Sequence, residues 1–148
     1  MKAAALRLLS HREYSRAELR AKLCRKGYAE AVVEQVVEDL VSEGWQSDGR
    51  FAEMLARSRA EKGYGPYRIA QELRQHGIDS DFGAEDGRDW NALIHKIYVK
   101  RFGETIPDSP KERAARERFL RRRGFESEQI RFLFKYLKVQ VFESHDSV

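Results

Sequence analysis

The densest cluster of charge in this chain is the segment KERAARERFLRRRGF, which begins at Lys111. From Lys111 to Arg123 it holds seven lysines and arginines against two glutamates. On a helix, at about 100° per residue, four of these cations lie away from Leu120 and form a basic ridge: Lys111, Arg118, Arg121 and Arg122. Such groups bind phosphate or carboxylate oxygens, so the ridge predicts contact with nucleic acid or with an acidic protein surface. The competing interpretation is a solvated helix face, partly neutralised by a Glu112 to Arg116 pair.

Two further sets of cations are candidates for the same role. The first lies near the N-terminus and the second in the middle of the chain: Arg16, Arg20, Arg25 and Lys26, and then Arg59, Lys62, Arg68 and Arg74. The first set is spread around its helix, which favours a solvated surface, whereas the second has fewer acidic residues at helical spacing. Arg57 differs, because Glu53 and Glu61 lie four residues to either side and predict surface ion pairs. Tyr64, between two glycines, is interpreted as a core residue in preference to a stacking platform for a base.

No combination of residues predicts catalysis. The four histidines stand far apart, and none lies at a metal-ligand or nucleophile spacing from Cys24. The sequence GYGP lacks the glycine spacing of a phosphate-binding loop. The acidic residues of the stretch IDSDFGAEDG are interpreted as a solvated loop and not as the metal cluster that a nuclease needs. We therefore expect no enzyme activity, no catalytic residue, no cofactor and no metal ion.

The composition bounds the fold and the compartment. With 41% hydrophobic and 35% charged residues, the 148-residue chain can bury one core or several small ones, with its charge on helix surfaces. Lysine and arginine exceed aspartate and glutamate by only 4, so the distribution of charge matters more than its sum. The single cysteine excludes an intramolecular disulfide, and no apolar run approaches the ~20 residues of a membrane span. We expect a cytoplasmic protein without a membrane partner, whose opening residues MKAAALRLL form a helix and not a signal peptide.

Helix start and stop signals divide the chain into short helices. The first helix is expected at residues 3–12, and a capping box of Ser15 with Glu18 begins a second helix that runs to Lys26. A second capping box, Ser109 with Glu112, begins a helix late in the chain. Gly27 ends this helix, and a third follows with apolar residues at helical spacing. These three helices make one unit.

The pattern of this unit occurs again twice. A leucine followed four residues later by a glycine is found at Gly27, Gly77 and Gly124, at offsets of 50 and 97 residues. The apolar residues of 33–40 match those of 130–137 at the same offset of 97. Such self-similarity is typical of repeat proteins.

The sequence thus predicts an all-α fold of three tandem three-helix repeats. The repeats span residues 1–46, 47–88 and 89–140, and a C-terminal tail follows at 141–148. The third helix of the middle repeat is shortened, because glycines and four acidic residues stand where it should lie. One repeat buries its apolar stripe poorly, so neighbouring repeats should stack into an elongated, curved array. The residues predicted to be buried are Leu19, Leu23, Val36, Leu40, Phe51, Leu55, Ile69, Leu73, Trp90, Ile94, Leu120, Ile130 and Leu133.

Residues 48–78, DGRFAEMLARSRAEKGYGPYRIAQELRQHGI, resemble the most recognisable stretch of the RecX family. The resemblance rests on the motif D-x-R-F-A-E followed by G-Y-G-P-x-R-I and a closing glycine, and SRAELRAKL and RFLRRRGF are similar to the family's other repeats. It covers roughly residues 3–137. The resemblance implies three tandem three-helix modules, association with RecA filaments on DNA, and restraint of recombination and the SOS response. The implied partners are the RecA filament and the single-stranded DNA within or beside it.

Three functions remain open at this point. The first is a RecA regulator that binds the filament and inhibits its ATPase, strand-exchange and SOS coprotease activities, with the three cation sets as contacts. The second is a stand-alone DNA-binding protein of the helix-turn-helix type, which predicts tight binding to free duplex. The third is a nucleic-acid enzyme, which requires an acidic metal cluster. We expect a monomer in each case.

Overall fold

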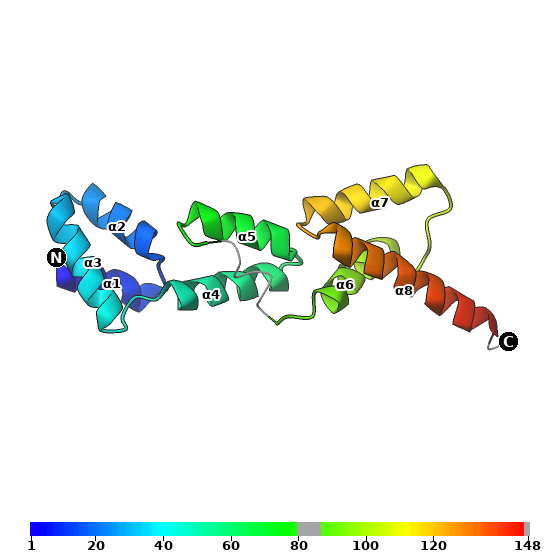
Figure 1. Cartoon of the computed structure of the whole chain (residues 1–148), viewed down its shortest axis with the longest axis horizontal. Helices are drawn as coiled ribbons and strands as arrows, with labels where there is room; N and C mark the ends of the chain where they lie inside the picture. Colours follow the sequence, from blue (N-terminus) through cyan, green and yellow to red (C-terminus); the bar gives the residue numbers. More distant parts are fainter. Residues whose placement is uncertain (80–86, 147–148) are drawn as a thin grey trace. The chain divides into compact units, whose positions relative to one another are not determined.

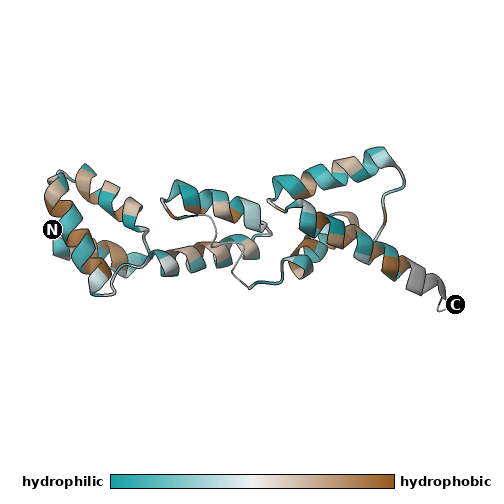
Figure 2. Ribbon diagram, in the orientation of Figure 1, coloured by the Kyte–Doolittle hydropathy of each residue, from teal (hydrophilic) through white to brown (hydrophobic). Residues whose placement is uncertain are grey.

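The computed structural model describes residues 1–79 and 87–146, and the side chains as far as residue 141. This part of the chain forms eight α-helices and no β-strand (Figure 1), which confirms the predicted all-α fold. Hydrophobic and hydrophilic residues occur together on the same helices (Figure 2), as expected where each helix buries one stripe. In chain order the helices are α1 (Lys2–His11), α2 (Arg16–Arg25), α3 (Glu30–Ser42), α4 (Asp48–Glu61), α5 (Pro66–Gln75), α6 (Trp90–Phe102), α7 (Pro110–Arg122) and α8 (Ser127–Asp146).

Both predicted capping boxes begin helices. Ser15 Oγ accepts a hydrogen bond from the backbone N–H of Glu18 at 3.1 Å, at the start of α2. Ser109 Oγ accepts one from the backbone N–H of Glu112 at 3.1 Å, at the start of α7. Each bond satisfies a donor of the first turn that has no partner within the helix.

The C-terminal ends of α2, α5 and α7 share one geometry. The glycines that follow them, Gly27, Gly77 and Gly124, have φ of 97°, 79° and 97°. Each donates its backbone N–H to a carbonyl three residues back, at 3.0 Å in all three cases. A left-handed residue at this position ends a helix, and glycine adopts it without a steric penalty. The sequence repeat is therefore a repeat of structure.

Two predictions about the repeats are not confirmed: one is wrong, and the other falls outside the described residues. The tail predicted at residues 141–148 is helical as far as the structure describes it, since α8 continues through Asp146. The segment from Ser127 to Asp146 contains neither glycine nor proline, so nothing in it ends the helix. The short third helix predicted for the middle repeat falls on residues 80–86, outside the described residues.

Two clusters of buried residues lie in the described part of the chain, one from α1 to α3 and one from α6 to α8, and α4 and α5 bury further residues such as Phe51 and Ile69. All the residues predicted to be buried are buried except Val36 and Trp90, which are partly exposed. Val33, Val37 and Leu40 occupy the face of α3 that meets the core, so Val36 lies at the edge of that face. Trp90 is the first residue of α6, where the helix covers it from one side only.

The described residues divide into two compact units that do not coincide with the three repeats. The first unit holds residues 1–57 and 70–79, and the second holds residues 58–69 and 87–146. The middle repeat therefore contributes to both units. Each unit includes a close contact between two repeats, at Gly77 and Ala17 in the first unit and at Gly65 and Gly124 in the second.

In the second unit, this contact joins the backbone before α5 to the backbone after α7. The N–H of Gly65 donates to the carbonyl of Arg123 at 2.8 Å, and the N–H of Tyr67 donates to the carbonyl of Gly124 at 2.9 Å. A Cβ on Gly65 would lie 2.5 Å from the Gly124 oxygen, and one on Gly124 would lie 2.4 Å from Arg68 Cβ. Only glycine fits at both positions.

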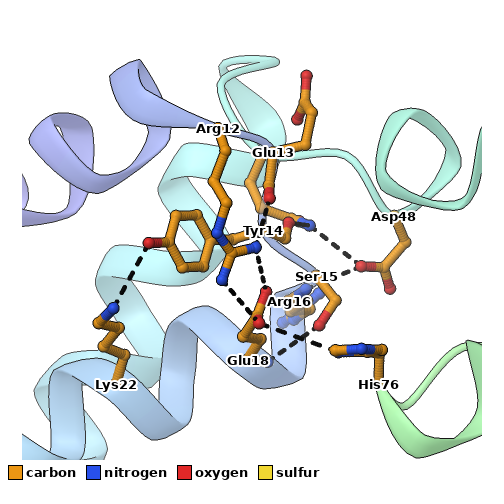
Figure 3. Close-up of polar contacts among 10 residues, drawn as sticks. Arg12, Glu13, Tyr14, Ser15, Arg16, Glu18, Lys22, Asp48 and His76 are labelled. Atoms are coloured by element: carbon orange, nitrogen blue, oxygen red, sulfur yellow. Dashed lines mark hydrogen bonds and ion pairs between the residues drawn. The ribbon is translucent and has the colours of Figure 1, made fainter. Parts of the chain in front are cut away.

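In the first unit, the start of α2 packs on the end of α5 and adds a polar network (Figure 3). A Cβ on Gly77 would lie 2.9 Å from Ala17 Cβ. Beside this contact, the two terminal nitrogens of Arg12 donate to the carboxylate of Glu18 at 3.0 and 2.9 Å. His76 Nδ1 lies 4.0 Å from the same carboxylate, and the Arg12 guanidinium lies 3.7 Å from the centre of the Tyr14 ring.

A second part of the network fixes the entry into α4. Asp48 Oδ1 accepts hydrogen bonds from the backbone N–H of Arg16 at 2.8 Å and from Gln46 Nε2 at 3.1 Å. Gln46 also donates to the carbonyl of Tyr14 at 3.1 Å and is fully enclosed. Buried polar groups are stable only when they are bonded in this way.

The carboxyl group of Glu18 carries the charge that this network stabilises. Burial raises the pKa of Glu18, but the hydrogen bond and charge of Arg12, the charge of His76 and the backbone of Ser15 together hold it below its ordinary value. A carboxylate with a depressed pKa stabilises the fold above its unfolded pKa, and this stability is lost as the pH falls through the folded pKa.

We expect Gly124→Ala to destabilise the protein more than Gly27→Ala does. Both glycines have φ of 97°, so both variants lose about 1–2 kcal/mol from left-handed backbone. A Cβ at residue 27 meets nothing within 4 Å, whereas one at residue 124 meets Arg68, which adds about 1–3 kcal/mol of overpacking. Urea unfolding followed by circular dichroism measures both. An equal loss of free energy of unfolding in both variants would show that the Gly124 turn is not in tight contact with the start of α5.

We expect Glu18→Gln to lower the free energy of unfolding at pH 7, by an amount that shrinks as the pH falls toward 3 through the folded pKa of Glu18. The reason is that the charge-dependent stability is already lost in the wild type at low pH. The measurement is urea unfolding of both proteins across this range. Glu38→Gln on the exposed side of α3 is the control. If the difference in free energy of unfolding between the wild type and Glu18→Gln stays constant with pH, the role of Arg12 and His76 is contradicted.

Candidate binding surface

The cations of α7 fall into two groups, and Arg116 is the centre of the first. Its Nη1 donates to Tyr98 Oη at 2.7 Å and to both oxygens of Thr105 at 3.1 Å. Its Nη2 donates to Glu112, which confirms the predicted pair within the helix. The side chain is only 12% exposed. Arg116 therefore ties α7 to α6 and to the linker between them, and it is not available to a partner.

Two other arginines of this segment also hold the second unit together. Arg113 Nε pairs with Glu117 Oε1 at 3.1 Å, and the guanidinium lies 4.5 Å from the centre of the Phe134 ring. Arg123 Nη1 donates to the carbonyl of Lys62 at 3.2 Å, and its guanidinium lies 5.1 Å from the Tyr64 ring centre. These bonds reach α8 and the end of α4.

The second group is the basic ridge predicted from the sequence. Its members Lys111, Arg118, Arg121 and Arg122 are all exposed, while Leu120 is buried. Arg121 donates to Ser127 Oγ at 3.1 Å. Among the described residues, the other three make neither an ion pair nor a hydrogen bond through their side chains. The ridge thus has the predicted geometry, and its ligand stays a prediction.

Beside the ridge lies a hollow that the sequence analysis did not predict. It has a volume of about 410 Å³ and is bounded by the end of α4, by α6 and by α7. Its apolar lining includes Leu93, Ile97 and Phe119. Five cations and one carboxylate also line it: Lys62, Lys96, Lys100, Arg101, Arg123 and Glu61. The hollow therefore combines apolar surface with a strong excess of positive charge.

The cations of the hollow differ in how freely they can meet a ligand. Arg123 is bonded to the Lys62 carbonyl, and the Arg101 guanidinium lies 5.0 Å from the Phe119 ring centre. The side-chain ammonium groups of Lys62, Lys96 and Lys100 have no ion-pair or hydrogen-bond partner within the described part of the chain. Such groups suit phosphate or carboxylate oxygens. Only Lys62 had been predicted as a contact.

The first-unit cations are not gathered into one site. Arg20 Nη1 pairs with Glu34 Oε1 at 2.6 Å, and Arg25 Nε contacts the carbonyl of Ala21 at 3.4 Å. Arg16 is half-buried, and Lys26 is exposed at the end of α2. These positions fit the solvated helix surface that the sequence analysis kept as an alternative.

The second predicted set is divided between the two units. Arg59, Lys62 and Arg68 belong to the second unit, whereas Arg74 belongs to the first. The guanidinium of Arg68 lies 3.9 Å from the centre of the Tyr64 ring, whose other neighbour is Arg123. Tyr64 is partly exposed and lies against two arginines, so it belongs to neither core cluster, and the interpretation as a core residue is wrong. Arg57 pairs with Glu53 at 3.0 Å, as predicted.

Among the described residues, no group of three or more histidines, cysteines or acids is placed to hold a metal ion. Cys24 is partly buried against the first core. No helix of the described residues has the length and apolar character to cross a membrane.

Three family models match successive stretches of this chain. They are the first three-helix domain of RecX at residues 2–40, the second at 47–85 and the third at 89–134. The fold is therefore a tandem array of three-helix domains with a basic surface in its last part. The chain belongs to the RecX family.

Individual relatives agree with the family models. Proteins named regulatory protein RecX include one from Halorhodospira halophila, which is 46% identical over 86% of this chain and 82% of its own length. Another, from Chromohalobacter salexigens, is 42% identical over 86% of both chains. The crystal structure of RecX from Lactobacillus salivarius has a TM-score of 0.74 at 22% identity and covers 93% of this chain and 94% of its own. At that identity the likeness concerns the fold.

We expect Arg116→Ala and Arg118→Ala to differ in stability, although the two residues lie on one helix. Loss of Arg116 removes its bonds to Tyr98, Thr105 and Glu112 and lowers the free energy of unfolding by about 1–3 kcal/mol. Loss of the exposed Arg118 changes it by less than about 0.5 kcal/mol. Thermal or urea unfolding tests both variants. A similar loss for the two would contradict the division of α7 into tied and free cations.

Proposed function

We propose that this chain is a regulator of RecA that binds RecA filaments on single-stranded DNA and inhibits their ATPase, strand-exchange and SOS coprotease activities. It thereby modulates DNA repair and recombination. The observation that carries the proposal is the match of three successive RecX domain models, from residue 2 to residue 134. The relatives with 46% and 42% identity are named regulatory proteins, which supports the same role.

The regulator acts by binding and not by catalysis, as a monomer in the cytoplasm. The free cations of α7 and of the hollow support binding to a polyanion, because Lys96, Lys100 and Arg118 have no acidic partner in the described residues. A filament presents phosphates and carboxylates at regular intervals. A chain with several weakly binding surfaces gains affinity when more than one is engaged at once. The geometry of the filament, and not the DNA sequence, then selects the target.

The test is the ATPase of RecA on single-stranded DNA, titrated with the intact chain. Inhibition should appear well below the concentration that saturates free DNA. Reversing Lys111, Arg118, Arg121 and Arg122 to Glu should weaken inhibition and leave the circular dichroism unchanged, because these side chains point away from the core. Binding should also weaken as the salt concentration rises.

A control is required because the reversals change the net charge of the whole chain. The double variant R118E/R122E is compared with R7E/R57E, which changes the charge equally at exposed positions of the first unit. Only the former should lose inhibition. No inhibition by the wild-type chain would overturn the proposal, and tight binding to free duplex without any effect on RecA would favour the helix-turn-helix alternative.

A further inference from the structure

The outward face of α8 is apolar, although its opposite face already packs in the core. Leu133 and Leu137 are buried, whereas Phe132, Tyr136 and Val139 are 44%, 38% and 49% exposed. The three exposed residues follow at helical spacing and form one stripe along the helix. A stripe of large apolar side chains on the surface marks a place of interaction.

The two aromatic rings of this stripe form an ordered pair. Phe132 and Tyr136 lie with ring centres 6.1 Å apart and planes inclined by only 13°. His95 of α6 contacts Tyr136 edge-on, with ring centres at 5.2 Å and an angle of 85°. Gln140 Nε2 donates to Tyr136 Oη at 2.8 Å. The Tyr136 ring is thus held from two sides, and the pair presents fixed aromatic surface.

Positive charge accompanies the aromatic pair. Arg131, Lys135 and Lys138 are exposed on α8, and the only bond among them in the described residues is a 3.5 Å contact from Arg131 Nε to the carbonyl of Ser127. Among the side chains that the structure describes, the carboxylates nearby are Glu128 on α8 and Glu104, which lies 3.9 Å from His95 Nε2. Neither pairs with these three cations.

This face of α8 is separate from the hollow described above. Ile97 lines the hollow, whereas His95 contacts Tyr136. At about 100° per residue, these two side chains of α6 point in directions roughly 160° apart. The two surfaces therefore lie on opposite sides of α6.

We propose that the stripe of Phe132 and Tyr136 with its flanking cations binds the unpaired bases of single-stranded DNA. Bases stack on the two rings, and Arg131, Lys135 and Lys138 contact the phosphates. Exposed aromatic rings among unpaired cations are what single-strand binding requires, and stacking on the ring faces makes such binding largely independent of sequence, because every base has a π-face. A purely apolar protein contact would leave the three cations without a role. This inference rests on the proposed function, because the single strand that these residues would contact is the DNA strand of the RecA filament.

The experiment measures binding of a fluorescent oligo(dT) to the intact chain by anisotropy, without RecA. F132A/Y136A should weaken binding about tenfold. F132L/Y136L should weaken it equally, because leucine keeps the apolar surface and loses the aromatic faces. Trp45→Ala is the matched control, because Trp45 is an aromatic residue of the first unit that is 54% exposed. This variant should bind oligo(dT) as the wild type does. K135E/K138E should reduce the slope of log affinity against log salt by about 1.4.

A second measurement locates the bases directly. Irradiating a complex with 5-iodouracil-substituted oligonucleotide should give adducts at Phe132 or Tyr136, identified by mass spectrometry. Three results would each overturn the inference. They are an affinity of F132L/Y136L equal to that of the wild type, adducts only at other residues, and no binding of oligo(dT) by the wild type at low salt. A wild-type dimer that becomes monomeric in F132A/Y136A would assign the stripe to a second copy instead. The two proposals can fail separately. If F132A/Y136A binds oligo(dT) as the wild type does and still inhibits RecA, the proposed function stands and this inference fails.

Discussion

The close approach of two backbone turns is the contact on which the second unit depends. Gly65 and Gly124 come so near that a Cβ on either would lie within 2.5 Å of an atom of the opposite turn. Two backbone hydrogen bonds at 2.8 and 2.9 Å then join segments almost sixty residues apart in the chain. This contact brings Arg123 within 3.2 Å of the Lys62 carbonyl and closes one side of the hollow. In the first unit, the Gly77 turn meets Ala17 in a similar way, and the Arg12 to Glu18 pair adds polar bonds.

Side-chain contacts between α7 and α6 explain how the charge of α7 is divided. Burying a guanidinium is favourable only where its donors are satisfied, and Arg116 meets this condition through Tyr98 and Thr105. A residue two positions on, such as Arg118, points to solvent and keeps its charge for a partner. A net excess of arginine in one helix therefore does not measure its binding capacity. What counts is the number of cations left over after the structural pairs are formed.

Local signals allowed much of the fold to be predicted from the sequence. Capping boxes, glycine stops and apolar spacing act within a few residues, so the starts of α2 and α7 and the turns at Gly27, Gly77 and Gly124 were found correctly. The hollow was missed because its lining comes from three separate segments, and only packing shows that Lys62 and Lys96 face one space. The two compact units were missed for the same reason. The repeat match correctly assigned Ile130 and Leu133 of α8 to the core, but the apolar residues at 132, 136 and 139 drew no attention, because helical spacing alone does not show that a second stripe stays exposed.

A repeat of short helices has a physical consequence for binding. Each helix needs about a third of its circumference to bury its stripe, so most of its surface remains for other contacts. In the last repeat, α6 uses this freedom twice, with Ile97 toward the hollow and His95 toward Tyr136 of α8. Several shallow, charged and aromatic surfaces are what such a repeat can build, and they suit the long, repetitive filament that we propose as the partner.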